Sequence, residues 1–471
     1  MKNPELLLTV VEDVDFYRDN NDHDKFYAEF ENQSKKKVFA PVDSKIFKSF
    51  LYAKSCDLAE DDEVLEPSSA VKSLCWLLEY QHAYQYVDVY NRISGTLKDI
   101  VEYDLQLPNQ KTVKITCDGW NISPKERKFI VSGTNLPQVK PKETLNSPLV
   151  LLKPFVNLAG DNFVLFVVWL IQAFVRGNHH ALLVFAERGS GKSTLSKMIK
   201  RITDPCKFDV TTIPQGIDNI CVLLNSTHVC CFDNVSSISR EVSDLLCGAI
   251  TGTAIVKRSL YTNSDANVSK LHNVIVINGI GVTPEQDDLA ERMLFFQLKK
   301  FKTTDTKLEA DIWADFEEAL PEILGSIFNT LSKAMTEIDS ISPVNLPRMA
   351  DSFVDMLAIA KALGIPENDF RRIYANNKRE LEEARIGTPL VNAVKEYMDT
   401  VNGRTFKGSA SMVYKEIYDH FSGEKSLIPS SASHFSRALD KEHSNLLKAG
   451  FRVNIDDTSA KSTEITIIKK K

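Results

Sequence analysis

Short apolar runs alternate with amphipathic segments through the middle of the chain. Residues 181–186, 228–233 and 273–279 read ALLVFA, HVCCFD and NVIVING. Continuous apolar runs of this length are typical of central strands in a parallel sheet that is covered on both faces. We therefore predict an α/β core over residues 149–300. The apolar stretch 163–175 is shorter than the roughly 20 residues that a membrane span needs, so it predicts a buried helix.

The segment before this core has a different pattern. Residues 1–145 combine a hairpin pattern at 26–42 with helical patterns at 43–56 and 68–85, which predicts an α+β N-terminal domain. Residues 133–148 contain three prolines and no apolar period, and this composition predicts a linker.

Two further segments follow the core. Residues 301–387 have a helical pattern broken by prolines, which predicts a helical lid or connector. Residues 388–471 read as three helices and two strand-like runs, the order of a winged helix-turn-helix. The third helix of that fold enters the DNA major groove. Its early polar residues are expected to face DNA: Ser433, His434, Ser436 and Arg437. The alternative is that the tail binds protein or caps the core.

Composition narrows the class of protein. The chain has 471 residues, of which 43% are hydrophobic and 25% charged, as in soluble globular proteins of several domains. The formal net charge of −6 gives no overall basic signature for nucleic acid. No C-x-x-C pair occurs among the eight cysteines, which argues against a zinc ribbon. We expect a cytoplasmic protein without a membrane segment, Cys230 and Cys231 in the core, and His179 and His180 on the surface.

The strongest chemical signal follows the first apolar run. Residues 186–194 read AERGSGKST, and the pattern G-x-x-x-x-G-K-[ST] departs only at Ala186. Glycines let successive backbone N–H groups surround phosphate oxygens, and the following helix adds partial positive charge at its N-terminus. This predicts an ATP-binding loop in which eight residues contact the nucleotide: Glu187, Arg188, Gly189, Ser190, Gly191, Lys192, Ser193 and Thr194.

Polar residues next to the apolar runs complete the predicted site. Lys192 would reach the β and γ phosphates, and Ser193 would ligate Mg²⁺. Asp233 ends the second run and is the candidate for a water-mediated contact to Mg²⁺. Asn234 stands where many ATPases have glutamate, so it can orient water but cannot accept its proton. Asn278 ends the third run and could position the attacking water; the alternative for it and for Asp233 is a simple strand-ending residue.

Two arginines are candidates for stabilising charge in the transition state. Arg292 could reach the γ-phosphate of a neighbouring copy, and the alternatives are a solvated arginine or an ion pair with Asp288 one turn away. Arg348 could play a similar role within its own chain.

The order of these motifs resembles a known family. GSGKST, FDNVS, DLLC, RSLYTN, VINGI, DLAER and LPRMAD follow one another over roughly residues 145–385. Phage and mobile-element ATP-binding proteins, which are similar to superfamily 3 and AAA+ replication helicases, have this order. The resemblance implies an α/β P-loop NTPase core of AAA+-like type. It also implies that ATP and Mg²⁺ are bound, with Asn278 as a sensor, Arg292 as an arginine finger, and three residues holding the nucleotide: Lys192, Ser193 and Asp233.

The resemblance implies partners as well. In helicase relatives, the segment between the second and third runs forms a hairpin that projects into a DNA channel. Lys257, Arg258 and Lys270 lie in this segment, and the alternative for them is a solvated loop. An arginine finger that acts between copies implies a homo-oligomeric ring, with a hexamer as one option.

The implied function is an ATP-dependent helicase or translocase acting on single-stranded or forked DNA during replication of a phage or mobile element. Two alternatives remain. One is an initiator or loader that uses ATP as a switch on DNA without unwinding, which Asn234 favours. The other is a nucleotide-gated signalling or defence ATPase.

Overall fold

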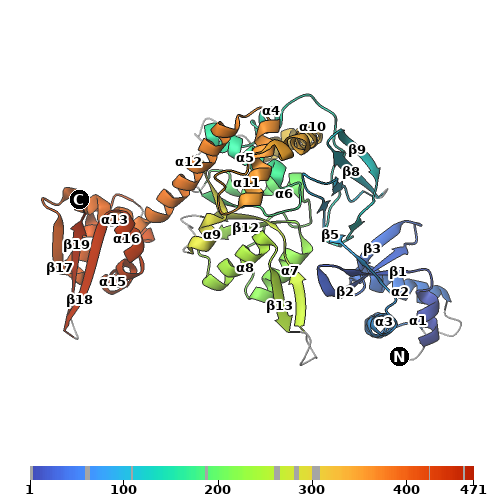
Figure 1. Ribbon diagram of the computed structural model, residues 1–471. Coiled ribbons are helices and arrows are strands. Elements are labelled where there is room, and N and C mark those ends of the chain that lie inside the picture. Colours follow the sequence, from blue (N-terminus) through green and yellow to red (C-terminus); the bar gives the residue numbers. More distant parts are fainter. Residues whose placement is uncertain are drawn as a thin grey trace. The chain divides into compact units, whose positions relative to one another are not determined.

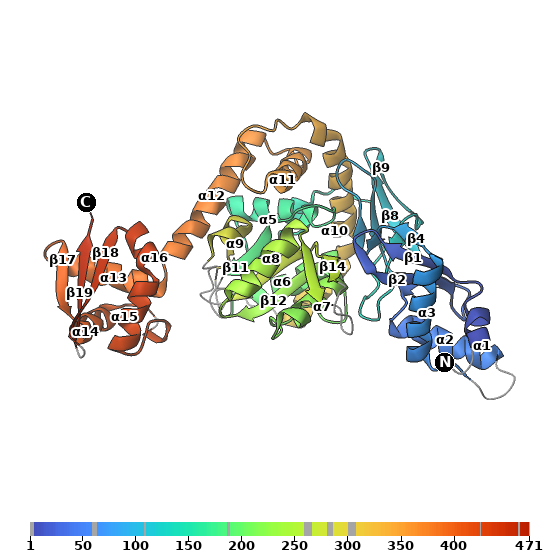
Figure 2. The same cartoon turned by 60° about the horizontal axis from the view of Figure 1, so that its bottom comes forward.

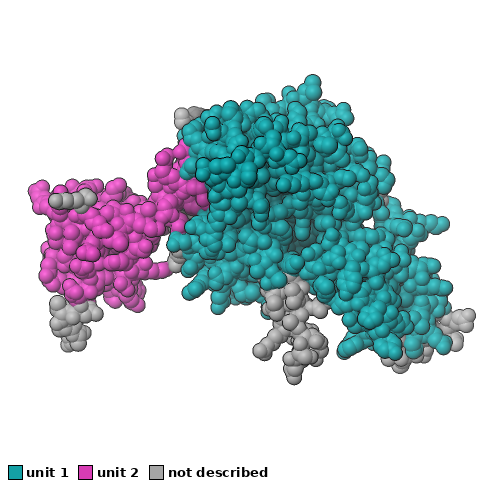
Figure 3. All heavy atoms as spheres, in the orientation of Figure 1, with its two compact units in different colours: residues 1–282, 286–375 teal, residues 283–285, 376–471 magenta. Residues whose placement is uncertain are grey.

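The computed structural model describes residues 4–58, 64–107, 110–185, 189–258, 266–279, 286–299, 308–423, 425–459 and 462–470. The chain has a mixed α/β architecture and forms two compact units, which Figure 3 distinguishes by colour. The first comprises residues 1–282 and 286–375, and the second comprises residues 283–285 and 376–471.

A four-stranded parallel sheet forms the centre of the first unit (Figure 1). Its strand order is β12-β15-β11-β16, and each neighbouring pair is parallel. All residues of β15 are buried, as expected for a central strand that is covered on both faces. The three apolar runs are therefore confirmed as strands of one parallel sheet: Ala181–Phe185 (β11), Val229–Val235 (β12) and Val274–Gly279 (β15). The fourth strand of this sheet is Met293–Gln297 (β16).

Helices of the first unit pack around this sheet (Figure 2). Helix α5 is buried along most of its length, which confirms the expected buried helix. The indole of Trp169 on α5 donates a hydrogen bond to the carbonyl of His180, 2.8 Å away, just before β11. The helices that precede or connect the strands are Gly160–Gln172 (α5), Lys192–Thr203 (α6), Ile217–Ser226 (α7), Arg240–Thr251 (α8) and Asp287–Glu291 (α9).

The described part of the predicted helical segment after the sheet contains three α-helices: Glu309–Glu337 (α10), Ala350–Ala362 (α11) and Glu367–Ile386 (α12). The chain before α5 crosses α10 closely at Gly325, where a Cβ atom would lie 1.8 Å from the carbonyl oxygen of Lys142. The backbone N–H of Lys142 donates to the carbonyl of Pro321, and Gln138 is buried. The segment 133–148, which we predicted as a linker, is thus an extended connection that packs against the core.

The N-terminal part contains two four-stranded sheets. The first has the order β3-β2-β1-β4 and packs with three helices around its own hydrophobic cluster. Its elements are Pro4–Val10 (α1), Asp15–Asp19 (β1), Asp22–Glu31 (β2), Lys37–Pro41 (β3), Lys45–Leu58 (α2), Pro67–Gln81 (α3) and Gln85–Val87 (β4). The expected hairpin and both helices of this domain are therefore confirmed.

The second N-terminal sheet packs against the helices that surround the parallel sheet. Its strands are Ile93–Ser94 (β6), Val101–Asp104 (β7), Lys111–Thr116 (β8) and Gly119–Pro124 (β9). The ring of Tyr103 lies 5.2 Å from that of Phe174 and 5.7 Å from that of Phe328 on α10. Residues that we assigned to the 1–145 domain thus share one hydrophobic cluster with the helices around the parallel sheet.

A buried ionic network joins this second sheet to α6. The carboxylate of Asp204 lies 3.3 Å from Nε of Arg92 and 2.7 Å from Nζ of Lys200, and all three side chains are at most 3% exposed. The backbone N–H groups of His228 and Val229 also donate to this carboxylate. Burial alone would raise the pKa of Asp204, but the charges of Lys200 and Arg92 overcome this effect and hold the pKa well below its ordinary range.

Two expectations about individual side chains have opposite outcomes. Cys230 and Cys231 are buried, as predicted. His179 and His180 are also buried, so the expectation of surface positions is wrong. Burial lowers the pKa of His179 to about 3. The ring nitrogens of His180 are satisfied by Ser352 Oγ and by the hydroxyl of Tyr374, each at 2.9 Å.

The second unit contains helices followed by an antiparallel hairpin, in a three-stranded sheet of order β17-β19-β18. Phe435 and Leu439, which belong to its third helix, are fully buried. The elements are Pro389–Thr400 (α13), Thr405–Ser409 (β17), Ala410–His420 (α14), Ala432–Lys441 (α15), His443–Lys448 (α16), Phe451–Ser459 (β18) and Ser462–Lys469 (β19). Among the described residues, no helix combines the length and apolar character that crossing a membrane requires.

Candidate functional site

The carboxyl edge of the parallel sheet gathers several of the predicted site residues. In the strand register, Val184 pairs with Asn278, and Phe232 pairs with Ile277. The end of β11, the Asp233–Asn234 pair and Asn278 therefore lie at the same edge. Open α/β sheets bind ligands in the crevice outside this edge.

The glycine-rich loop connects β11 to α6 at this edge. Ala186, Glu187 and Arg188 lie outside the described residues. Gly189 and Gly191 have φ angles of 78° and 81°, a left-handed conformation that glycine adopts without strain. Helix α6 begins immediately after Gly191, so the predicted contact residues Lys192, Ser193 and Thr194 occupy its first turn. The N–H groups of a first turn have no partner within the helix and are available to an anion.

The amide of Asn278 connects two elements of the site. Its Oδ1 accepts a hydrogen bond from the backbone N–H of Asn234 at 3.2 Å, and its Nδ2 donates to Ser196 Oγ on α6 at 2.9 Å. The side chain is fully buried. Each end of an amide can make a second hydrogen bond, so a role toward water would use this remaining capacity. In the structure, Asn278 bridges the end of β12 and the helix that carries Lys192.

The backbone conformation at position 234 favours asparagine. Its φ angle is 54°, in the left-handed region, where the pairing of β12 with β15 shifts register. Its N–H donates to the carboxylate of Asp233 at 2.8 Å. Asparagine tolerates this conformation, whereas for most other residues it costs roughly 1–2 kcal/mol. A glutamate at this position would therefore be strained.

A cavity of about 540 Å³ adjoins the glycine-rich loop. Ser190, Gly191 and Thr194 line one side of it, and the remaining lining is largely apolar. This volume lies within the range of small-molecule sites, and an apolar lining with few polar groups is typical of them. The other lining residues were not predictable from sequence, because they come from distant segments with no shared motif: Pro154, Phe155, Val156, Asn157, Leu195, Met198, Leu298, Ile312 and Asp315.

Arg292 lies at the opposite edge of the sheet from the glycine-rich loop. Its carbonyl accepts a hydrogen bond from the N–H of Ala181, the first residue of β11. At roughly 3.3 Å per residue, the length of β11 puts about 17 Å between Arg292 and the loop of its own chain. Any contact of Arg292 with a nucleotide would therefore have to be made to a neighbouring copy.

Within the chain, Arg292 forms the ion pair that we gave as its alternative role. Its side chain is 15% exposed and pairs with Asp288, which also pairs with Arg348. Arg348 makes a second pair with Glu291. The hydrogen bond from Arg292 is the main cause that lowers the pKa of Asp288 to about 2. The role of Arg292 as an arginine finger toward a neighbouring copy stays a prediction. Arg348 pairs with two residues of α9, and its role toward a nucleotide of its own chain also stays a prediction.

The hairpin expected between the second and third runs is present. Strands Ala254–Arg258 (β13) and Ala266–Lys270 (β14) pair in antiparallel fashion. Arg258 and Ala266 pair at the far end, and Ala254 and Lys270 pair at the base. The side chains of Lys257 and Arg258 lie outside the described residues, whereas that of Lys270 is exposed.

The second unit has a groove of about 720 Å³ beside α15. Three of the four residues predicted to face DNA line it, namely Ser433, Ser436 and Arg437. His434 is exposed but does not line the groove. The starts of α14 and α15 and the β18–β19 hairpin form the walls, so a helix and a hairpin face the same space.

Part of the chain is similar to a family of replication proteins. Residues 149–370 match a family described as Actinomycete integrative conjugative element replication protein. No curated protein matches the chain. Among solved structures, the apo C-terminal region of NrS-1 aligns over 99% of both chains with 11% identity and a TM-score of 0.40. The JCV helicase aligns over 49% of this chain and 72% of its own, with 12% identity and a TM-score of 0.23.

Proposed function

We propose that the chain is an ATPase that binds Mg-ATP at the carboxyl edge of its parallel sheet and uses hydrolysis to move along or unwind DNA. The setting that we propose is the replication of a mobile genetic element. One observation carries the nucleotide part: the glycine-rich loop lines a largely apolar cavity of about 540 Å³. Phosphates would lie on the loop, and the base would occupy the cavity.

The residues at this edge fit the proposed cofactor. Lys192 would contact the β and γ phosphates, and Ser193 and Asp233 would supply oxygen atoms to Mg²⁺, directly and through water. Asp233 and Asn278 lie near the carboxyl ends of the neighbouring strands β12 and β15, and β15 pairs with β11, which leads into the loop. Asn278 would couple the position of Asp233 to α6, because its amide bridges the two elements. Arg292 would act on a nucleotide of the next copy in a homo-oligomeric ring.

The DNA part of the proposal rests on two surfaces and one likeness. The β13–β14 hairpin carries basic residues, and the groove beside α15 has the helix-and-hairpin walls of a winged helix-turn-helix. The matched family consists of replication proteins.

Asn234 favours a second candidate function, a switch that assembles on DNA in the ATP state without unwinding. An amide cannot take the proton of the attacking water, and the left-handed backbone at this position disfavours glutamate. Slow hydrolysis would suit an initiator or loader better than a motor.

Hydrolysis of ATP with and without single-stranded DNA tests the proposal. We expect DNA to stimulate hydrolysis several-fold, and a forked duplex to be unwound in an ATP-dependent manner. Stimulated hydrolysis without unwinding would support the switch. Hydrolysis that does not respond to DNA would contradict both DNA functions and would favour a signalling ATPase.

The cavity next to the loop gives a separate prediction. Ile312→Asn places a polar amide in the apolar wall, so we expect ATP to bind about tenfold more weakly, while inorganic triphosphate binds as before. Isothermal titration with the two ligands measures this difference. Asp311→Asn is the matched control, because Asp311 is the exposed neighbour on α10 and does not line the cavity. Equal loss for both ligands would show that the base does not occupy the cavity.

A further inference from the structure

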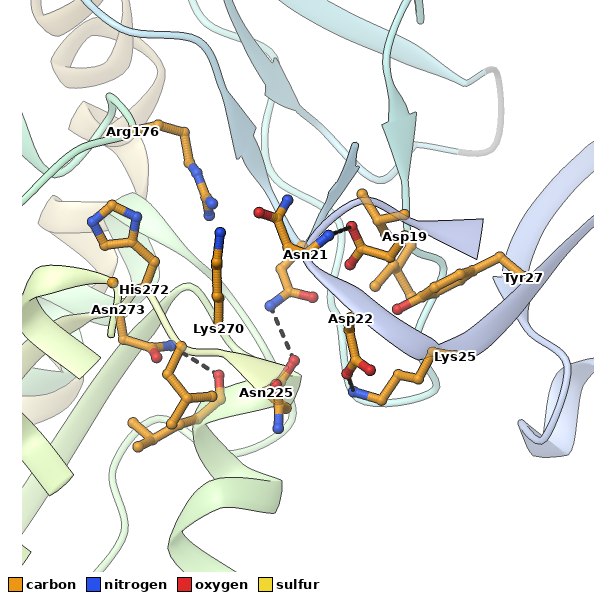
Figure 4. A pocket seen from close by; sticks show the side chains of 16 residues that line it. Asp19, Asn21, Asp22, Lys25, Tyr27, Arg176, Asn225, Lys270, His272 and Asn273 are labelled. Atoms are coloured by element: carbon orange, nitrogen blue, oxygen red, sulfur yellow. Dashed lines mark hydrogen bonds and ion pairs between the residues drawn. The ribbon is translucent and has the colours of Figure 1, made fainter. Parts of the chain in front are cut away.

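A second cavity, of about 130 Å³, lies within the first unit between the β1–β2 turn and the base of the β13–β14 hairpin. Figure 4 shows the guanidinium of Arg176 and the ammonium of Lys270 pointing toward each other into this space. Arg176 follows α5, and Lys270 is the last residue of β14. Segments distant in sequence thus bring two cations to one cavity.

The carboxylates of the cavity are already engaged by other groups. Asp22 pairs with Lys25 at 2.8 Å, and Asp19 accepts a hydrogen bond from the N–H of Asn21 at 3.0 Å. In the described part of the chain, no carboxylate lies within ion-pair distance of Arg176 or Lys270. The guanidinium of Arg176 lies 5.7 Å from the ring centre of Tyr90. Burial is the main cause that lowers its pKa, and the charges of Asp19 and Asp88, which lie beyond ion-pair distance, offset this only in part. A largely buried cation without a close counter-charge is costly unless a ligand supplies one.

Further polar atoms in the cavity lack a partner. Nε2 of His272 and Oδ1 of Asn273 are buried and have no hydrogen-bond partner among the described residues. Burial lowers the pKa of His272 to about 4, so its ring is neutral at pH 7. Three cations and two carboxylates therefore line the cavity, which leaves an excess of positive charge. Buried polar groups are normally satisfied, and water can donate a hydrogen bond to Oδ1 of Asn273. The excess of positive charge indicates an anionic ligand beside that water.

We propose that this cavity binds one phosphate group of a nucleic-acid strand that passes the base of the β13–β14 hairpin, with Arg176 and Lys270 as the contacts. A cavity of about 150 Å³ holds a single small ring, so this space suits one phosphate with water rather than a whole nucleotide. The strand is the favoured source, because Lys270 belongs to the β13–β14 hairpin, on which the DNA part of the proposed function rests, and proteins follow a single strand with basic side chains. The inference rests on the DNA part of the proposed function.

Strand affinity without ATP tests the site. The full chain and the double variant Arg176→Gln, Lys270→Gln are titrated with labelled oligo(dT) over a range of salt concentrations. We expect about tenfold weaker binding at low salt, and a salt dependence that is reduced by roughly 0.7 in slope, the value for one phosphate contact on a single strand. The matched control is Lys37→Gln, Lys45→Gln, which removes the same charge from exposed positions of the N-terminal part. Lys270→Gln alone changes an exposed side chain and keeps the test valid if the double variant does not fold.

Each other outcome overturns a defined part of the proposal. An equal loss in the control variant would show a general charge effect and overturn the site. Unchanged strand binding, together with an increase in Tm by inorganic phosphate that only the wild type shows, would overturn the strand as ligand in favour of a free phosphate compound. Wild-type protein that binds no oligo(dT) would contradict the DNA part of the proposed function, whereas wild type and variant that bind it equally would contradict only this site.

Discussion

Replacing Asp204 with asparagine is expected to lower the free energy of unfolding of the first unit by about 3–5 kcal/mol, the cost of removing one partner of a buried ion pair. Asparagine keeps the shape and can still accept the backbone hydrogen bonds of His228 and Val229. It removes the charge, however, and leaves Lys200 and Arg92 buried together without a counter-charge. Urea unfolding followed by tryptophan fluorescence measures the loss.

Glu317→Gln is the matched control for this prediction. Glu317 lies on α10 and pairs with Arg201, which is next to Lys200 on α6. Its carboxylate is 42% exposed, unlike that of Asp204. Exposed pairs contribute about 0–1 kcal/mol, so the control variant should stay close to wild type. If the two variants lost the same amount, the buried network would not be what joins the second sheet to α6.

The same carboxylate gives a dependence on pH. Its pKa in the folded chain is below the ordinary value, so its stabilising effect is fully present at neutral pH and is lost as pH falls through about 3.9, the pKa of an unperturbed aspartate, and below. Wild-type protein should therefore lose stability more steeply than Asp204→Asn when urea unfolding is repeated at decreasing pH across this value. Parallel acid limbs would mean that Asp204 has the same pKa in the folded and unfolded states.

Local sequence patterns were sufficient to predict the central strands of the fold. The strands β11, β12 and β15 were predictable because each is a continuous apolar run, and a strand buried on both faces needs no alternation. The start of α6 was also predictable from a local pattern, because Gly191 and Lys192 belong to the glycine-rich motif that precedes a helix. The edge at which Asp233 and Asn278 meet follows once the strands are parallel.

Contacts between distant segments were not predictable. Arg92 and Asp204 are 112 positions apart, and neither has a neighbour that marks it as half of a pair. The apolar wall of the cavity near the loop comes from segments before α5, after β16 and on α10, which no motif connects. The packing of the 133–148 segment was not predictable, because its composition is that of a loop, while long-range contacts such as that of Lys142 to Pro321 hold its backbone.

Lys192→Ala is expected to reduce ATP hydrolysis by at least about 100-fold, the typical cost of losing one group that stabilises developing charge. Lys192 occupies the first turn of α6, next to the loop that would hold the phosphates. Since the cavity would still receive the base, we expect kcat to fall much more than nucleotide affinity does. Single-turnover hydrolysis and a fluorescent ATP analogue measure the two quantities separately.

Lys197→Ala is the matched control, because Lys197 lies on the same helix but more than one helical turn beyond Lys192. Its substitution by alanine also keeps helix propensity high. Hydrolysis should stay near the wild-type rate in this variant, with or without single-stranded DNA. A Lys192→Ala protein that hydrolysed ATP as fast as Lys197→Ala would remove the glycine-rich loop from the chemistry, and the nucleotide site would then have to lie elsewhere in the first unit.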